Sequence, residues 1–150
     1  MRQSKLQYEW LETGYELPPA SYDISAKVVS KYLEAVDESS NLYYQPDNPQ
    51  ALTGLVPPMA IAAYTMATLS QSLSLPPGTI HITQEIECLK TLSVGTRITC
   101  YAKVSRKQER SNLRFLTIDL SAFDENKNLV LLGKTGFAFP KPKSNSTDRQ

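Results

Sequence analysis

The chain has 150 residues, a formal net charge of +1 at pH 7, 41% hydrophobic residues and 21% charged residues. This size fits one domain with a sizeable core, and the apolar content excludes an intrinsically disordered chain. A near-neutral balance argues against a dedicated nucleic-acid-binding protein, which normally carries a basic face. No apolar run approaches the roughly 18 residues that span a bilayer, and the opening MRQSKLQYEW lacks the apolar core of a signal peptide. We therefore expect a cytoplasmic protein that binds neither nucleic acid nor membrane.

The first third of the chain predicts an arm, a helix and a loop. The segment 6–17 carries three aromatic residues and ends at Pro18-Pro19, which predicts a short strand or an irregular arm packed by its aromatic side chains. Ser25 is a suitable N-cap for a helix over 26–36. One face of this helix collects Val28, Val29, Tyr32, Leu33 and Val36. The residues from there to Gly54 predict a loop that Tyr43 and Tyr44 anchor.

The segment 58–73 is the most distinctive stretch of the sequence. Pro57 and Pro58 stand where a helix starts, and proline is tolerated there because its missing N–H would have no helical partner. The following run is apolar on nearly every side. A helix of this kind is buried all round rather than laid on a surface.

The remaining sequence predicts strands only, over 80–89, 97–105, 113–123 and 129–139. A polar turn is expected over 108–112. Period-two alternation points Ile98, Cys100, Ala102 and Val104 inward on one strand, and Leu116, Ile118, Leu120 and Ala122 on the next. In the first strand, His81, Glu85 and Glu87 share the face opposite the isoleucine row, where they could form a polar strip at a dimer seam. One buried helix followed by long strands indicates an α+β fold with a curved sheet around a helix.

Cysteine and histidine are too few for a standard metal site. Cys88 and Cys100 are the only cysteines and are interpreted as free, half-buried thiols of a cytosolic protein. His81 is the only histidine, so a zinc site would lack ligands. We predict no metal and no cofactor.

In this order, the pieces resemble a single hotdog domain of the MaoC-like dehydratase family, which includes (R)-specific enoyl-CoA hydratases and 3-hydroxyacyl-thioester dehydratases. The resemblance runs from about residue 11 to residue 139. It is carried by LETGYELP at 11–18, YLEAVD at 32–37, VPPM at 56–59, HITQEI at 81–86 with LSVG at 92–95, and NLVLLGK at 128–134. It implies a long curved antiparallel β-sheet wrapped around a central α-helix, over one domain at 1–140 with a flexible polar tail at 141–150. The family also implies pairing of chains through sheet edges.

The sequence departs from active members of that family at two places. They carry an Asp and a His five positions apart after the first helix, and a Gly where the central helix starts. The pair activates the water that adds to an enoyl thioester, and the helix start polarises the thioester carbonyl. Here Asp37 falls on the Asp position, Leu42 falls on the His position, and Pro57-Pro58 replaces the usual His-Gly. This form is similar to degenerate, non-catalytic halves that pair with a catalytic one.

Three residues are candidate catalytic groups: Asp37, His81 and Glu85. Asp37 is the best acid, although we favour its interpretation as a helix-terminal residue with local loop hydrogen bonds, because no histidine lies nearby in the sequence. His81 titrates near neutral pH, yet a strand histidine is more often structural or interfacial. Glu85 is the acid that a thioesterase of this fold could use, or else part of a solvated face.

The candidate substrate-binding residues are Pro57, Pro58, Met59, Ala62, Arg106 and Arg110. Met59 and Ala62 could line an acyl channel near the helix start, while the rest of that helix is core. The basic residues around 103–114 form either a solvated hairpin end or a site for the phosphates of coenzyme A or the acidic face of an acyl carrier protein.

The sequence therefore predicts an acyl-thioester-binding subunit that takes acyl-CoA or an acyl carrier protein thioester. It would act as a homodimer or as a heterodimer with a catalytic MaoC-like subunit. Two alternatives stay open: an active hydratase or thioesterase with rearranged residues, and a structural homodimer without a thioester site.

Overall fold

The computed structural model describes residues 5–143. Its elements follow the chain in this order: η1 (Tyr8–Trp10), β1 (Ala20–Ile24), α1 (Ala26–Ala35), β2 (Tyr44–Gln45), β3 (Asn48–Leu52), α2 (Pro58–Ser72), β4 (Ile80–Cys88), β5 (Thr96–Arg110), β6 (Leu113–Phe123) and β7 (Leu129–Pro140).

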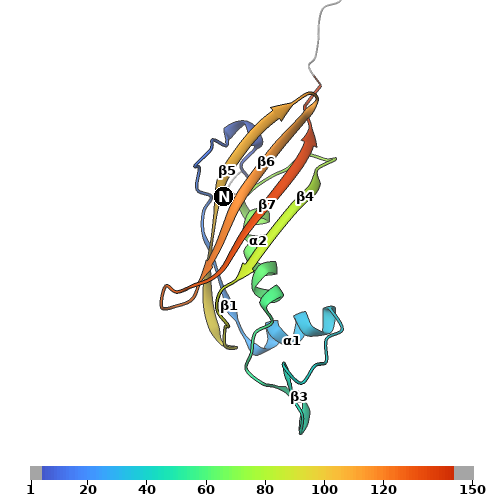
Figure 1. Cartoon of the computed structure of the whole chain (residues 1–150), viewed down its shortest axis with the longest axis vertical. Helices are drawn as coiled ribbons and strands as arrows, with labels where there is room; N and C mark the ends of the chain where they lie inside the picture. Colours follow the sequence, from blue (N-terminus) through green and yellow to red (C-terminus); the bar gives the residue numbers. More distant parts are fainter. Residues whose placement is uncertain (1–4, 144–150) are drawn as a thin grey trace, which may run out of the picture.

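Five strands form one antiparallel sheet in the order β1-β5-β6-β7-β4. Helix α2 packs on β5, β6 and β7, and α1 lies beyond one end of the sheet beside β3 (Figure 1). The predicted α+β hotdog architecture, with a long antiparallel sheet around a central helix, is therefore confirmed.

The inner face of the sheet is apolar because its strands alternate as predicted. The inward residues are Ile98, Cys100, Ala102 and Val104 on β5, and Leu116, Ile118, Leu120 and Ala122 on β6, all of them buried. They divide into two clusters along α2. One gathers α1 and the first half of α2, and the other gathers the N-terminal arm and the second half of α2. Tyr43 and Tyr44 pack on the first cluster, as predicted for anchors of the loop.

Three elements differ from the sequence-based expectation. Strand β1 follows the proline pair directly, and the predicted loop contains the small β2–β3 hairpin. Strand β5 continues to Arg110, so the expected polar turn shrinks to Ser111 and Asn112. Charged residues can continue this strand because its last residues are exposed to solvent, while β6 remains paired with both β5 and β7 up to Leu113.

The N-terminal arm takes the irregular form of the two predicted alternatives. Its backbone lies along the edge of β5 beyond β1, with Gly14 N–H donating to the Val104 carbonyl at 2.7 Å and Leu17 N–H to the Ala102 carbonyl at 2.9 Å. Further back, the Leu6 N–H donates to the Ser72 carbonyl at the end of α2 at 2.8 Å. The arm therefore shields an edge that would otherwise present free backbone groups.

A β-bulge in β4 changes which side chains share a face. The pairing of β4 with β7 shifts between His81 and Thr83, and His81 lies opposite Phe137 whereas Glu85 lies opposite Lys134. Phe137 and Lys134 point to opposite faces of β7, because their positions differ by an odd number. His81 thus lies on the inner face and Glu85 on the outer face, so the predicted strip of His81, Glu85 and Glu87 is wrong. Sequence alternation missed it because a bulge inserts one residue into the period.

Cys100 is buried and Cys88 is exposed, so neither thiol is half-buried as predicted. Of the predicted tail, the Lys141 N–H donates to the Asn112 carbonyl at 2.8 Å, while 144–150 lie outside the described residues. No helix within residues 5–143 has the length and apolar character needed to cross a membrane.

Candidate functional site

A residue just before the start of α2 is hydrogen-bonded to the turn that leads into strand β5. The Val56 N–H donates to the Leu92 carbonyl in the turn before β5 at 2.9 Å. Pro57 is buried and is the N-cap residue, with φ of −60°, whereas Pro58 is exposed and opens the first turn. The rigid proline pair therefore sets the direction in which the helix leaves the turn.

Few backbone donors remain at this helix start. Pro57 and Pro58 have no N–H, and the Ala60 N–H donates to the Pro57 carbonyl at 3.0 Å. The Met59 N–H has no partner within residues 5–143, and Met59 is 53% exposed. An acceptor approaching α2 therefore finds one free amide where a helix start ordinarily offers several. Ala62, by contrast, is buried in the core.

Asp37 occupies a helix-terminating position. Its φ is +55°, its N–H donates to the Glu34 carbonyl at 3.2 Å, and the Glu38 N–H donates to the Leu33 carbonyl at 2.9 Å. These two bonds form a Schellman motif in which Asp37 is the left-handed residue after the C-cap. The local hydrogen bonds expected at Asp37 are therefore made by its backbone.

Leu42 is 64% exposed in the loop before β2. The Leu42 N–H donates to Ser40 Oγ at 3.1 Å, and its carbonyl accepts from Thr53 Oγ1 at 2.6 Å. A hollow of about 580 Å³ lies between the end of α1 and the β2–β3 hairpin. Its lining includes Ser30, Leu33, Glu34, Asp37, Glu38, Ser39, Asn41, Tyr44, Gln45, Pro46, Pro49 and Gln50. Asp37 and Asn41 therefore face one hollow, which no histidine lines.

His81 lies elsewhere in the fold. Its Nε2 atom is 2.7 Å from Thr135 Oγ1, and its ring lies 5.1 Å from the Phe137 ring. It is the second residue of β4, where that strand pairs with the C-terminal part of β7. Figure 1 shows this end of β4 far from α1. Asp37, His81 and Glu85 are thus distributed over three separate surfaces.

The basic residues around the β5–β6 hairpin divide between the two faces of the sheet. Lys103, Arg106 and Arg110 lie opposite Asp119, Thr117 and Leu113 on the outer face, while Lys107 and Glu109 lie opposite Leu116 and Arg114 on the inner face. A second register shift, between Val104 and Arg106, causes this division. The two candidate phosphate-binding residues, Arg106 and Arg110, therefore share the outer face, whereas Lys107 and Arg114 lie on the inner face.

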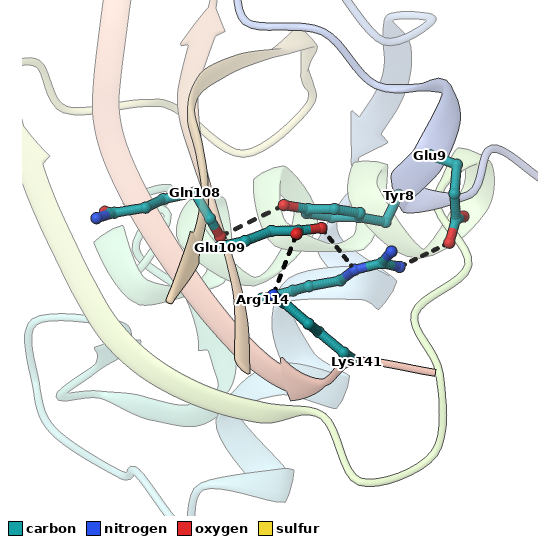
Figure 2. A network of polar contacts seen from close by, with 6 residues as sticks. All are labelled: Tyr8, Glu9, Gln108, Glu109, Arg114 and Lys141. Atoms are coloured by element: carbon teal, nitrogen blue, oxygen red, sulfur yellow. Dashed lines mark hydrogen bonds and ion pairs between the residues drawn. The ribbon is translucent and has the colours of Figure 1, made fainter. Parts of the chain in front are cut away.

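Glu109 and Arg114 on the inner face belong to a polar network that sequence reasoning missed (Figure 2). Arg114 Nη1 donates to Glu9 Oε1 at 2.6 Å, and Arg114 Nε donates to Glu109 Oε1 at 3.0 Å. Lys141 Nζ lies 3.3 Å from Glu109 Oε2. The Tyr8 hydroxyl donates to the Gln108 carbonyl at 3.4 Å. The network therefore joins the N-terminal arm, the β5–β6 hairpin and the end of β7.

The network perturbs the acidity of its members. The hydrogen bond from Arg114 lowers the pKa of Glu9, and the hydrogen bond from Lys141 lowers the pKa of Glu109. Burial raises the pKa of the Tyr8 hydroxyl. The carboxylates are therefore held in their charged form, and the phenol is held neutral.

The family model for the FAS1-like, dehydratase domain region matches residues 12–131. The chain belongs to this dehydratase family. This match covers the second half of the arm, both helices and the sheet as far as the first residues of β7, and it confirms the MaoC-like hotdog assignment. No curated protein matches the chain.

Solved structures of low sequence identity share the fold of this dehydratase-family chain. The (R)-hydratase from A. caviae involved in PHA biosynthesis is 20% identical, with a TM-score of 0.70 over 86% of this chain and 97% of that chain. The MaoC-like dehydratase from Rhodospirillum rubrum is 17% identical, with a TM-score of 0.67 over 90% of this chain and 97% of that chain. A chain of the ChsH1-ChsH2 complex from Mycobacterium tuberculosis is 8% identical, with a TM-score of 0.65 over 85% of this chain and 98% of that chain.

The chemistry open to this dehydratase-family chain follows from the groups that its surfaces expose. Within residues 5–143, no group of three or more His, Cys, Asp or Glu side chains is placed to hold a metal ion. The helix start offers one amide and the Met59 side chain, and the hollow beside the end of α1 offers the Asp37 carboxylate without a histidine. This arrangement supports binding better than proton transfer.

Proposed function

We propose that this dehydratase-family chain binds an acyl thioester, of coenzyme A or of an acyl carrier protein, and serves as a non-catalytic subunit beside a catalytic MaoC-like chain. The observation that carries the proposal is the start of α2, where Pro57 and Pro58 remove two backbone donors and leave the Met59 amide free. A single amide N–H can donate a hydrogen bond to a thioester carbonyl, but it supplies little of the stabilisation that a developing oxyanion needs.

The distribution of titratable groups supports the absence of hydration chemistry. General acid–base catalysis needs the acid and the base within hydrogen-bond reach of one substrate. Asp37 faces the hollow beside α1, whereas His81 is hydrogen-bonded to Thr135 near the C-terminal part of β7. The exposed Leu42 side chain stands where the family resemblance expects the proton-transferring histidine.

The proposed pairing with another chain rests on β4. This strand is an edge of the sheet, and every residue of β4 except Ile86 is exposed. A nine-residue edge with free backbone groups is a template for strand addition. The ChsH1-ChsH2 complex from Mycobacterium tuberculosis, whose fold is similar, contains two different chains. A heterodimer through β4 is therefore our preferred arrangement, with a homodimer as the alternative.

Arg106 and Arg110, on the outer face of the sheet, lie too far from the start of α2 to contact a thioester bound there. β5 has 15 residues, so Arg110 lies roughly 45 Å along the strand from its start, at about 3.3 Å per residue. The start of β5 adjoins α2, because the Val94 N–H donates to the Gly54 carbonyl at 2.7 Å. Arg106 and Arg110 can therefore contribute to phosphate binding only for a thioester that a second chain presents.

A hydration assay tests the proposed function. Crotonyl-CoA is incubated with the chain alone, and with the chain plus a catalytic MaoC-like chain that forms a complex with it. We expect no loss of enoyl absorbance with the chain alone, and turnover only when the second chain is present. Hydration by the chain alone would show an active hydratase, and release of free thiol would show a thioesterase.

A pair of variants locates the thioester. Met59→Trp fills the space before the helix start, so we expect it to weaken crotonyl-CoA binding at least about tenfold, which corresponds to about 1.4 kcal/mol. Leu132→Trp adds the same bulk on an exposed outer position of the sheet and is the matched control. Equal effects of the two variants would contradict a site at the start of α2. Absence of binding to the unmodified chain would favour the structural homodimer.

A further inference from the structure

A second hollow lies at the opposite end of α2 from the proposed thioester site. Its volume is about 430 Å³. It is lined by Gln7, Tyr8, Glu9, Ser74, Pro76, Pro77, Arg114, Phe139, Pro140, Lys141 and Pro142. We call it the arm hollow, because the N-terminal arm forms one wall. α2 has 15 residues and is about 22 Å long, so the arm hollow is separate from the start of that helix.

Arg114 is the central polar group of the arm hollow. Its side chain is only 15% exposed, and its two carboxylate partners differ in how firmly they are placed. Glu109 belongs to β5, is held by Lys141 as well, and lies directly opposite Arg114 in the sheet. Glu9 belongs to the three-residue turn η1, and its side chain is 50% exposed. Glu9 is therefore the partner that can leave Arg114 at low cost.

The cluster has a surplus of positive charge even with both carboxylates in place. Lys107 Nζ lies 4.3 Å from the centre of the Tyr8 ring, and Arg114 Cζ lies 4.7 Å from it. With Lys141, three cations face the two carboxylates of Glu9 and Glu109. Withdrawal of Glu9 raises the surplus from one charge to two, and a partly buried surplus attracts an anion.

The walls of the arm hollow are apolar and stiff. The Tyr8 and Phe139 rings pack edge to face with their centres 5.2 Å apart. Four prolines, at 76, 77, 140 and 142, complete the lining. Rings and prolines lose little conformational freedom when a ligand binds, so such walls suit an apolar body.

We propose that the arm hollow is a binding site for a small amphipathic carboxylate. The carboxylate of the ligand takes the place of Glu9 on Arg114, and its apolar body lies between Tyr8, Phe139 and the prolines. A carboxylate is favoured because the position on the guanidinium is already shaped for one by Glu9. A volume of about 430 Å³ falls within the range of small-molecule sites. The site is independent of the thioester proposal.

The chain contains an intrinsic fluorescence probe beside this site. Trp10 is the only tryptophan, it follows Glu9 in η1, and it is exposed. Displacement of Glu9 therefore changes the surroundings of Trp10. We expect saturable changes in Trp10 fluorescence on titration with sodium octanoate, and none on titration with 1-octanol, which has the same chain without the charge.

Two substitutions test the roles of Arg114 and Glu9, with octanoate affinity measured by isothermal titration calorimetry, because the Trp10 signal depends on displacement of Glu9 itself. Arg114→Gln is expected to weaken octanoate binding at least about tenfold, because a charge-assisted pair is lost. Glu9→Ala removes the internal competitor and is expected to tighten binding about two- to five-fold, the range that exposed ion pairs imply. Glu12→Ala, on the exposed part of the same arm, is the matched control and should leave the affinity unchanged.

The proposal is overturned if octanoate leaves Trp10 fluorescence unchanged, or if octanol and octanoate act alike. It is also overturned if Glu9→Ala weakens binding or has the same effect as Glu12→Ala. Glu9→Ala changes only an exposed side chain, so this readout remains decisive even if Arg114→Gln destabilises the fold. Hydration and binding of crotonyl-CoA are measured separately, and failure of either proposal leaves the other standing.

Discussion

His81 Nε2 lies 2.7 Å from Thr135 Oγ1, so the only histidine of the chain is hydrogen-bonded to a fully buried hydroxyl. This pair joins the edge strand β4 to its neighbour β7 just beside the bulge that brings His81 to the inner face. The bond gives His81 a structural role in holding the edge of the sheet.

The first prediction concerns this pair. His81→Ala leaves the buried Thr135 hydroxyl without its partner, which costs about 1–2 kcal/mol of the free energy of unfolding. Thr135→Val removes the hydroxyl itself, so adding His81→Ala to that variant costs close to nothing more. Urea denaturation of the wild type, both single variants and the double variant measures the coupling. An equal cost of His81→Ala in both backgrounds would disprove the structural role.

The second prediction concerns the helix-terminating position. Asp37→Gly should raise the free energy of unfolding by about 0.5–1 kcal/mol, because glycine adopts a φ near +55° without strain. Asp37→Ala removes the same carboxylate but keeps a side chain at positive φ, so it should be less stable than Asp37→Gly by about 1 kcal/mol. Thermal denaturation measures the order. If both variants lost stability equally, the carboxylate itself would be the stabilising group.

The third prediction concerns the close contact between β4 and β7. A side chain at Gly136 would collide with Thr83 Oγ1, so Gly136→Ala should cost about 1–3 kcal/mol of stability. Thr83→Ala removes the colliding atom and should restore most of that loss. Gly133→Ala on the same strand is the control, because its added Cβ would lie 3.4 Å from Leu120 Cβ. A Gly136→Ala variant as stable as the wild type would show that β4 does not approach β7 this closely.

The fourth prediction concerns acid stability. Hydrogen bonds from Asn128, first of all from its backbone N–H, lower the pKa of Asp124 from 3.8 to about 2, with further bonds from Lys90 and the Asn126 N–H. A lowered carboxyl pKa stabilises the fold above the unfolded pKa, and that contribution is lost as pH falls from about 4 to about 2.

Asp124→Asn tests this pH window. The variant should be less stable than the wild type at pH 6, and the difference should shrink as the pH approaches 2, as followed by urea midpoints. A constant difference between Asp124→Asn and the wild type at every pH would contradict the prediction.

Periodic patterns predicted the core of the fold. Helices α1 and α2 and the strands β4 to β7 were expected because apolar residues recur at helical spacing in 26–36, without a polar face in 58–73, and at alternate positions after Ile80. The inward rows of β5 and β6 were right residue by residue, because one face of these strands packs on α2.

Elements set by long-range pairing were missed. Strand β1 forms because its five residues pair with the start of β5, and nothing in ASYDI itself predicts a strand. The bulges near His81 and Arg106 each shift the alternation, which reversed the face assigned to His81 and divided the basic cluster. The network of Glu9, Glu109 and Arg114 joins residues 105 positions apart in the sequence, so no local signal could reveal it.

Isothermal titration of the chain alone with crotonyl-CoA tests the central claim most directly, because one trace reports binding and turnover together. We predict a saturable heat of binding that returns to the baseline after each injection, with no continuing heat of reaction. A sustained heat that consumes the enoyl thioester would show that the chain is itself an active enzyme. A flat trace would show that it lacks the thioester site.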